Sequence, residues 1–226
     1  MQEGRISRRR ALFGLGGLFA AAATGAWKSD ALGSSEGPAA VASGEVTCVL
    51  APEQTEGPYY ISSVRVRRNI TEGRAGRALT LRLRVVDAST CKPIKGASVD
   101  VWHCDAAGAY SGVQGNSGTF MRGVQKTDAH GYAIFRTVYP GWYQGRTVHI
   151  HVKVHLGGNV LHTGQLYFPD AVTDAVYRRA PYSRRRSRST RNANDTVYRN
   201  GGKRSLLALR KTGTGYTGSI TMGVQR

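Results

Sequence analysis

The sequence lacks the patterns of several fold classes. No stretch repeats along the 226 residues, and no long segment places apolar residues at the spacing of an amphipathic helix. Short runs that alternate apolar with polar residues, rich in Val and Thr, stand between turns, and the chain holds 29 glycines and 7 prolines. These features predict one all-β domain with long loops.

A run long enough to span a bilayer is also missing. The apolar stretch 11–23 is shorter than the roughly 20 residues that a spanning helix needs. It follows the basic segment 7–12 (SRRRAL), which resembles a twin-arginine export signal. We expect a signal peptide at 1–26, a flexible leader at 27–44 and the folded domain at 45–226. A basic membrane anchor is the alternative; the signal predicts an exported, extracellular or cell-envelope protein with no stable membrane anchor after cleavage.

Acidic residues are scarce, with 14 Asp and Glu against 32 Lys and Arg and a net charge of +18. The arginines crowd into residues 178–191. Such a stretch is typical either of a nucleic-acid-binding tail or of a solvated, partly mobile loop that concentrates anionic material. Only Tyr177 and Tyr182 accompany these arginines, so bases would find little to stack on. We favour the solvated loop and expect no specific nucleic-acid partner.

Cysteines are few, with three in the chain. In an exported protein this count predicts one disulfide and one thiol. Cys91 and Cys104 flank the predicted strand 97–103, which would hold them about 20 Å apart at about 3.3 Å per residue and so prevent their pairing. Cys48 is then the expected partner of one of them, and the sequence does not say which.

The alternating runs predict strands at 79–87, 97–103, 132–138 and 159–168. We expect the first two to form a hairpin, and the last to pair with the strand that precedes the Gly157–Gly158 turn. Residues 48–60 and 105–123 are expected to be loops. The C-terminal part is expected to be loop except for short apolar pieces at 206–209 and 219–222.

The segment 145–155 (GRTVHIHVKVH) alternates most regularly, and its valine face predicts a half-buried strand. On the opposite face His149 and His151 are two residues apart, so their side chains project the same way and can converge on one point. A lone pair of this kind is often only a polar sheet face. A metal site would require further ligands from elsewhere in the chain.

Carboxylate ligands near this pair are missing. An acidic residue two to five positions away would complete a facial triad for ferrous iron, but none is there, and only Asp105 and Asp128 stand upstream in neighbouring loops. Tyrosine is abundant instead, with 11 residues. Phenolate oxygen is a hard anionic donor that suits ferric iron. Two phenolates, two imidazoles and a hydroxide would leave the centre nearly neutral and easier to bury.

Five motifs, in this order, resemble the intradiol ring-cleavage dioxygenases. They are residues 55–60 (TEGPYY), 101–111 (VWHCDAAGAYS), 139–143 (YPGWY), 145–151 (GRTVHIH) and 163–168 (TGQLYF). The resemblance covers 48 to about 195 and is greatest to the exported, stand-alone branch of the family. It implies a β-sandwich with the metal near one end.

The resemblance also implies the roles of individual residues. A non-haem iron(III) ion, Fe(3+), would be held by Tyr110, Tyr143, His149 and His151. Tyr143 would be the axial ligand that leaves when substrate binds, and it would share catalysis with Arg146. Substrate binding or pocket formation would fall to Gln165, Pro58 and Tyr59. His103, His155 and His162 are expected to be structural or exposed.

The implied reaction inserts both atoms of O2 into a small aromatic diol, a catechol-type 1,2-dihydroxybenzene, and gives a cis,cis-muconate. Together with the export signal, it predicts extracellular breakdown of lignin-derived aromatic compounds. The particular diol and the oligomeric state, monomer or homodimer, stay open. The alternative is a non-catalytic exported basic β-sandwich that binds a partner.

Overall fold

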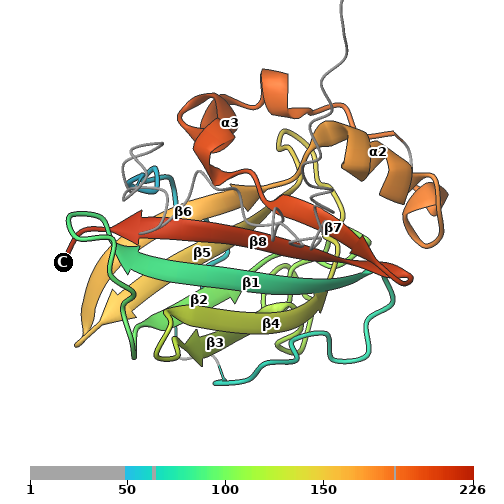
Figure 1. The fold of residues 1–226 in the computed structure, drawn as a ribbon. Helices are drawn as coiled ribbons and strands as arrows, with labels where there is room; N and C mark the ends of the chain where they lie inside the picture. The colour runs from blue at the N-terminus through green and yellow to red at the C-terminus, as the bar shows by residue number, and fades with distance from the viewer. Residues whose placement is uncertain (1–48, 63–64, 186) are drawn as a thin grey trace, which may run out of the picture.

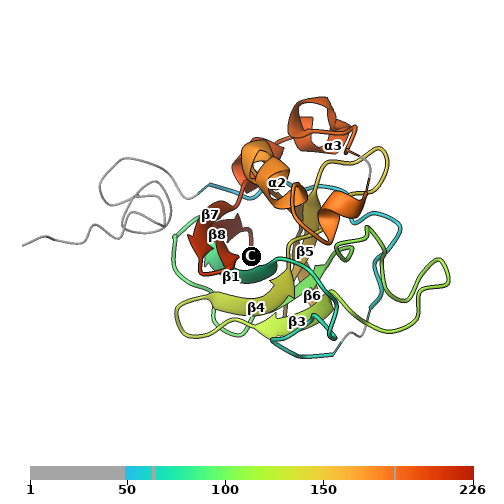
Figure 2. The same ribbon diagram turned by 90° about the vertical axis from the view of Figure 1, so that its right-hand side faces the viewer.

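The computed structural model describes residues 49–62, 65–185 and 187–226, which form two four-stranded sheets packed face to face (Figures 1 and 2). One sheet has the order β4 (Tyr132–Val138), β1 (Ala78–Asp87), β8 (Gly215–Val224) and β7 (Ala208–Thr212). The other has the order β3 (Arg122–Lys126), β2 (Ser98–Trp102), β5 (His149–Leu156) and β6 (Asn159–Tyr167). The prediction of an all-β sandwich is confirmed.

The alternating residues of the strands fill the space between the sheets. Leu81 and Leu83 of β1 and Ile150 and Val152 of β5 are all 0% exposed and belong to one apolar cluster. Each side chain of this size contributes about 1.5–3 kcal/mol when fully buried. The valine face of β5 therefore lies in the core as predicted, and His149 and His151 face the other side of the sheet.

The expected hairpin of the first two strands is wrong, because β1 and β2 lie in different sheets. β1 pairs antiparallel with β4 and parallel with β8, whereas β2 pairs with β3 and β5. The Asp87 carboxylate accepts hydrogen bonds from the amides of Ser89 and Thr90. This turn starts the connection from β1 in one sheet to β2 in the other. Both strands bury an apolar face in the core between the two sheets.

The hairpin of β5 and β6 is confirmed. The strands pair antiparallel from His149–Tyr167 to the Gly157–Gly158 turn, and both glycines have positive φ angles, 58° and 87°. The register shifts once, between Val154 and His155, so the irregularity lies toward the turn and away from His149.

The C-terminal part contains more structure than the sequence predicts. Besides β7 and β8 it has the helices α2 (Asp170–Tyr177) and α3 (Thr196–Arg199) and the 3₁₀ turns Tyr182–Arg184, Asn192–Asn194 and Gly202–Ser205. The two helices lie along one side of the sandwich (Figure 1). With 8 residues, α2 is too short to show a helical period in the sequence.

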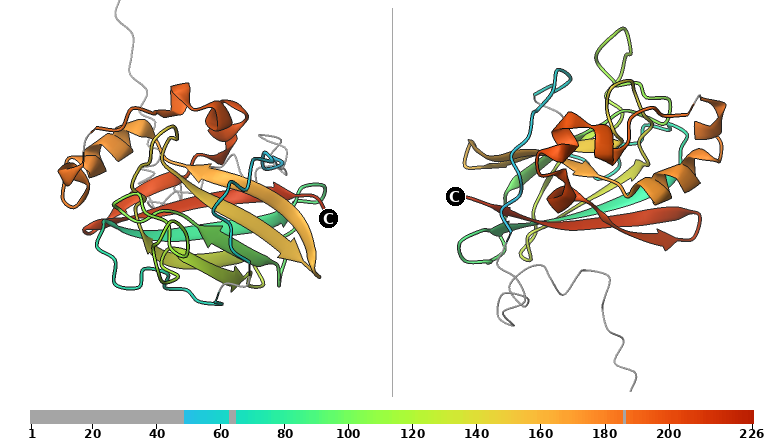
Figure 3. Two further views of the ribbon diagram at one scale, coloured as in Figure 1. Left: turned by 180° about the vertical axis from the view of Figure 1, so that it is seen from behind. Right: turned by 90° about the horizontal axis from the view of Figure 1, so that it is seen from above.

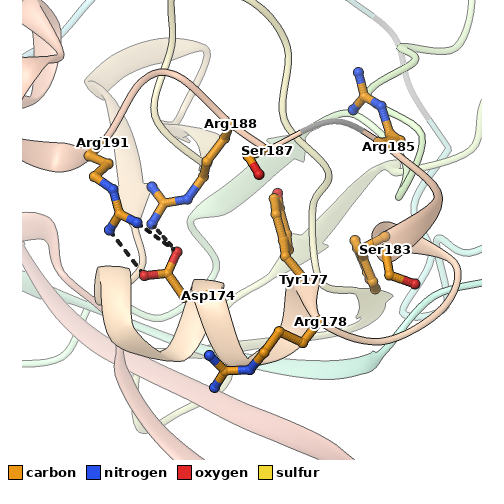
Figure 4. A pocket seen from close by; sticks show the side chains of 9 residues that line it. Asp174, Tyr177, Arg178, Ser183, Arg185, Ser187, Arg188 and Arg191 are labelled. Atoms are coloured by element: carbon orange, nitrogen blue, oxygen red, sulfur yellow. Dashed lines mark hydrogen bonds and ion pairs between the residues drawn. The ribbon is translucent and has the colours of Figure 1, made fainter.

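The arginine-rich stretch packs against α2 instead of forming a solvated loop throughout. Arg188 is only 8% exposed and pairs with Asp170 and Asp174. Figure 4 shows Arg191 on the same Asp174 carboxylate, at a pocket of about 310 Å³ that Arg178 also lines. The expectation of a solvated, partly mobile loop is wrong for Arg188, because its charge is neutralised inside the fold.

Two of the three cysteines lie in the described residues. Cys91 is disulfide-bonded and Cys104 is a free, buried thiol, which confirms that these two do not pair with each other. Cys48, the predicted signal peptide and the leader lie outside the described residues. Within the described part, no helix has the length and apolar character needed to cross a membrane.

Candidate metal centre and active site

The histidines of β5 lie on the outer face of their sheet, beneath covering loops. The segment that precedes residue 63 runs across β5 and β6 (Figure 3), where the Gln54 amide donates to the Thr163 carbonyl. Gly57 in this segment has a φ angle of +72°, and a Cβ there would lie 3.1 Å from His151 Cε1. This close approach covers His151, and both His149 and His151 are only 2% exposed.

Two phenols and two imidazoles converge at this place. Tyr143 Oη lies 3.0 Å from His149 Nε2, which lies 3.1 Å from His151 Nε2. The Tyr110 ring centroid is 5.7 Å from that of Tyr143 and 6.3 Å from that of His151. The structure thus brings together all four side chains that the family resemblance implies as iron ligands.

A hydrogen bond fixes the tautomer and the ring orientation of His149. Its Nδ1 lies 2.6 Å from the Thr147 carbonyl and must carry the hydrogen, so Nε2 offers a lone pair to the cluster. Burial, with help from the positive charge of Arg146, lowers the pKa of His149 to about 3. Burial and the neighbouring His149 lower the pKa of His151 well below its ordinary value. Both rings are therefore neutral near pH 7, as metal ligands must be.

The donor set fits a ferric ion. The Tyr110 hydroxyl is buried and has no hydrogen-bond partner among the described residues, an arrangement that costs about 1–3 kcal/mol unless another group binds the oxygen. A metal ion would be such a group. The described residues contain no cluster of three or more His, Cys, Asp or Glu that could hold a metal, so phenolate oxygens would supply the anionic ligands, and these suit iron(III).

Close backbone packing joins the loops that carry the two tyrosines. The Asp105 carbonyl, five residues before Tyr110, accepts a hydrogen bond of 2.9 Å from the amide of Gly141, two residues before Tyr143. A Cβ on Gly141 would lie 2.6 Å from the carbonyl oxygens of Asp105 and Ala106. Only glycine allows this contact, which holds the two tyrosine-bearing loops against each other.

Arg146 is held rigidly beside the histidines. Its Nε donates to Asp195 Oδ2 at 2.9 Å, and its Nη2 donates to Gln165 Oε1. Gln165 in turn donates from Nε2 to the Thr55 carbonyl at 2.9 Å. The predicted catalytic arginine and the predicted second-sphere glutamine therefore touch each other, and both are oriented by further partners.

Asp195 is a site residue that sequence reasoning missed. Its carboxylate is fully buried, and it accepts hydrogen bonds from the amides of Thr147 and Tyr198 besides pairing with Arg146. It stands 49 positions after Arg146, so no local motif connects the two. Its one sequence signal is an Asp before Thr196, which is typical of a helix N-cap and matches its place at the start of α3.

Of the two predicted substrate-binding residues in the covering segment, Tyr59 lies against Tyr110 and Pro58 lies at the surface. The Tyr59 ring is 4.7 Å from that of Tyr110 and partly exposed, and its hydroxyl accepts a hydrogen bond from Gln114 Nε2. Tyr59 thus forms a wall of the site. Pro58 is exposed beside it, and contact between Pro58 and substrate stays a prediction.

The other histidines have structural partners. His103 bonds the Cys104 carbonyl and the Thr137 hydroxyl, and His162 bonds Glu53. His155 lies in β5 and is partly exposed. No metal role is needed to explain any of these side chains.

Comparison with known proteins agrees with this geometry. Residues 55–178, just over half of the chain, match the family model described as dioxygenase. Chlorocatechol 1,2-dioxygenase of Pseudomonas sp. (strain P51) is 31% identical over 137 residues, which cover 50% of this chain and 53% of that protein. Catechol 1,2-dioxygenase 2 of Acinetobacter lwoffii is 34% identical over 105 residues, 42% of this chain and 38% of the relative. The chain spans about half the length of the curated relatives it matches.

Solved structures match over more of the chain. An intradiol ring-cleavage dioxygenase from Tetranychus urticae superposes with a TM-score of 0.76 at 36% identity, covering 79% of this chain and 95% of that one. The dioxygenase domain of a carbohydrate-binding fusion protein from Streptomyces sp. SirexAA-E gives a TM-score of 0.62 at 32% identity, covering 78% of this chain and 99% of that one. With the family match and the converging tyrosines and histidines, these likenesses show that the chain belongs to the intradiol ring-cleavage dioxygenases.

Proposed function

We propose that this protein is a non-haem iron(III) dioxygenase that cleaves catechol-type diols between their two hydroxyl-bearing carbons. Both atoms of O2 enter the product, a cis,cis-muconate, so the reaction needs no external reductant. The observation that carries the proposal is the convergence of Tyr110, Tyr143, His149 and His151, where the buried Tyr110 hydroxyl has no hydrogen-bond partner among the described residues. Relatives named catechol and chlorocatechol 1,2-dioxygenases support it.

The four converging side chains would hold the iron. When bound, the ferric ion would supply a Lewis acid, which would favour the deprotonated form of the diol and make its ring reactive toward oxygen. The protein contributes a preformed site, because β5 fixes both histidines on one sheet face and the Asp105–Gly141 contact fixes the loops of the two tyrosines.

The two tyrosines have different surroundings. Tyr110 is 2% exposed, whereas Tyr143 is partly exposed and lies at the accessible side of the cluster. Its hydroxyl oxygen lies 3.0 Å from His149 Nε2 at this accessible side, where an entering diol would meet it first. Tyr143 Oη is therefore the group suited to accept a proton from an entering diol, while Tyr110 stays in place.

Arg146 supplies a fixed positive charge. Asp195 and Gln165 occupy its Nε and Nη2, so the guanidinium cannot rotate away from the site. Such a preoriented cation stabilises negative charge that develops on the substrate, and it does so without reorganisation during the reaction. Tyr59 bounds the space next to Tyr110 and would contact the substrate ring.

The physiological setting is part of the proposal. The twin-arginine-like segment at residues 7–12 supports export, and export would place the enzyme where lignin-derived diols occur. One solved relative is the dioxygenase domain of a fusion with a carbohydrate-binding protein from a cellulolytic bacterium, which supports a role in plant polymer breakdown.

The test is oxygen uptake by purified protein loaded with ferric iron. Catechol, protocatechuate, hydroxyquinol and larger lignin-derived diols are compared, with product absorbance followed in the ultraviolet. We expect one O2 consumed per diol for at least one of them, and a visible tyrosinate-to-iron band in the resting protein.

Variants identify the ligands. Tyr110→Phe and Tyr143→Phe should each weaken or shift the visible band. The matched control is Tyr139→Phe, because Tyr139 is also buried but bonds Thr173 away from the site. Two results together would overturn the proposal: no oxygen uptake with any diol, and a visible spectrum in all three variants that is the same as in the wild type.

A further inference from the structure

Arg122 is a buried cation that the proposed reaction does not use. It opens β3 and is 1% exposed. In the sheet register Trp102 pairs with Arg122 on one side and with His151 on the other, and His151 pairs with Gln165. Because paired residues point to the same face, these four side chains form a continuous row that includes the proposed iron ligand His151. Arg122 stands at the end of the row nearest the Tyr110 loop.

The guanidinium of Arg122 joins two segments that line the site. Its Nη1 donates to the Tyr59 carbonyl at 2.7 Å, and its Nη2 and Nε donate to the Ser111 carbonyl at 2.8 and 3.1 Å. Ser111 follows Tyr110 directly, and the Tyr59 and Tyr110 rings are 4.7 Å apart. Arg122 therefore ties the segment of the pocket wall to the segment of an iron ligand.

The charge of Arg122 is not explained by an ion pair. No carboxylate lies within 4.0 Å of its guanidinium among the described residues, and burial lowers the pKa of Arg122 although Tyr110 and Asp100 oppose that shift. Burial of an unpaired cation is costly. A neutral side chain would avoid that cost, but among side chains only the arginine fork offers five donors in fixed directions that reach both carbonyls at once.

We propose that Arg122 is a positioning residue that sets the separation of Tyr59 and Tyr110, and through it the width of the diol pocket and the orientation of the Tyr110 ligand. This inference rests on the proposed function. Loss of the fork lets the two segments move apart. The apparent affinity for the diol then falls and the environment of the Tyr110 phenolate changes, while the reacting groups Tyr143 and Arg146 keep their own partners.

The experiment compares Arg122→Gln and Arg122→Lys with the wild type as iron-loaded proteins. Glutamine reaches one carbonyl, and lysine keeps the charge without the fork. We expect KM for catechol to rise roughly tenfold in both variants, with a smaller change in kcat and a shifted visible band. Arg122→Lys retains a buried cation and three donors, so KM, kcat and the visible band can be measured on it even if Arg122→Gln does not fold.

The matched control is Arg67→Gln. Arg67 also binds two backbone carbonyls, those of Thr119 and Arg122, but it touches neither Tyr59 nor Ser111. This variant should lose thermal stability yet keep the wild-type KM and band. A general loosening would instead change KM and band as much in Arg67→Gln as in Arg122→Gln, and that result overturns the proposal.

Two further outcomes are decisive. Wild-type KM and band in Arg122→Lys would mean that charge alone matters and would overturn the positioning role. Failure of the proposed function has a different signature, because the wild-type protein itself would then show neither a tyrosinate band nor oxygen uptake.

Discussion

Replacement of Asp195 by Asn tests whether this buried carboxylate orients Arg146. The side chain is 0% exposed and accepts from Arg146 Nε at 2.9 Å, the Thr147 amide at 2.8 Å and the Tyr198 amide at 2.7 Å. An amide has one acceptor oxygen, so in either orientation its NH2 group faces a donor. The substitution removes the charge that balances Arg146 and also leaves a buried donor unsatisfied.

The size of the effect follows from these contacts. Breaking a buried ion pair by removing one partner costs about 3–5 kcal/mol, and we take the lower value, about 3 kcal/mol, because the Arg146 side chain is 17% exposed. For a domain of this size about 1 kcal/mol lowers Tm by roughly 2–4 °C, so Tm should fall by roughly 6–12 °C. The matched control is Asp174→Asn, since Asp174 also binds two arginines but is 35% exposed, and it should cost about 1 kcal/mol or less.

The pH dependence gives a second measurement on metal-free protein. Burial alone would raise the pKa of Asp195, but the amides of Tyr198 and Thr147 and the Arg146 ion pair lower it below the ordinary value. A carboxyl with a lowered pKa stabilises the fold above its unfolded pKa of about 3.9, and that stabilisation is lost as the pH falls through the folded pKa. The Tm difference between wild type and Asp195→Asn should therefore be largest near neutral pH and shrink in acid. A variant as stable as Asp174→Asn at neutral pH would refute the reasoning.

Three further predictions concern the centre and its loops. Gly141→Ala should destabilise the protein by about 1–3 kcal/mol and shift the visible band, because its Cβ would lie 2.6 Å from two carbonyl oxygens; an unchanged Tm and spectrum would contradict the close contact. Cys104 is 1% exposed and burial raises the pKa of its thiol to about 12, so mass spectrometry should find it alkylated only after unfolding, and rapid labelling of the native protein would contradict its burial. Removal of iron by a chelator should lower the free energy of unfolding by about 2.7 kcal/mol when iron had been present at 100 times its Kd, and equal Tm values with and without iron would count against a site formed only in the folded state.

The strands were predictable where the alternation of residues was regular. The range 132–138 matches β4, and the hairpin of β5 and β6 followed from its alternation and its Gly–Gly turn. The first two strands were found but paired wrongly, because alternation identifies a buried face and does not say which of two sheets that face belongs to. Helix α2 was not predicted, because its two turns are too few to show a helical period in the sequence.

The site was predictable where its residues stand in local motifs. His149 and His151 could be paired from their spacing alone, whereas Tyr110 and Tyr143 required the resemblance to a family. Asp195 could not be found, since its link to Arg146 exists only after the chain folds back over 49 positions. The partners of Arg188 are likewise set by the packing of α2, which the sequence did not indicate.

The single shift in register between Val154 and His155 has a practical consequence. It separates the Gly157–Gly158 turn from the part of β5 that holds His149. Among the described residues, nothing lies within 4 Å of where a Cβ would stand on either glycine. Extra residues at this hairpin tip would project into open space, and the bulge would absorb the change in strand length. The tip is thus the natural position for attaching a tag, a surface linker or a second module, because the candidate metal centre lies at the other end of the strand.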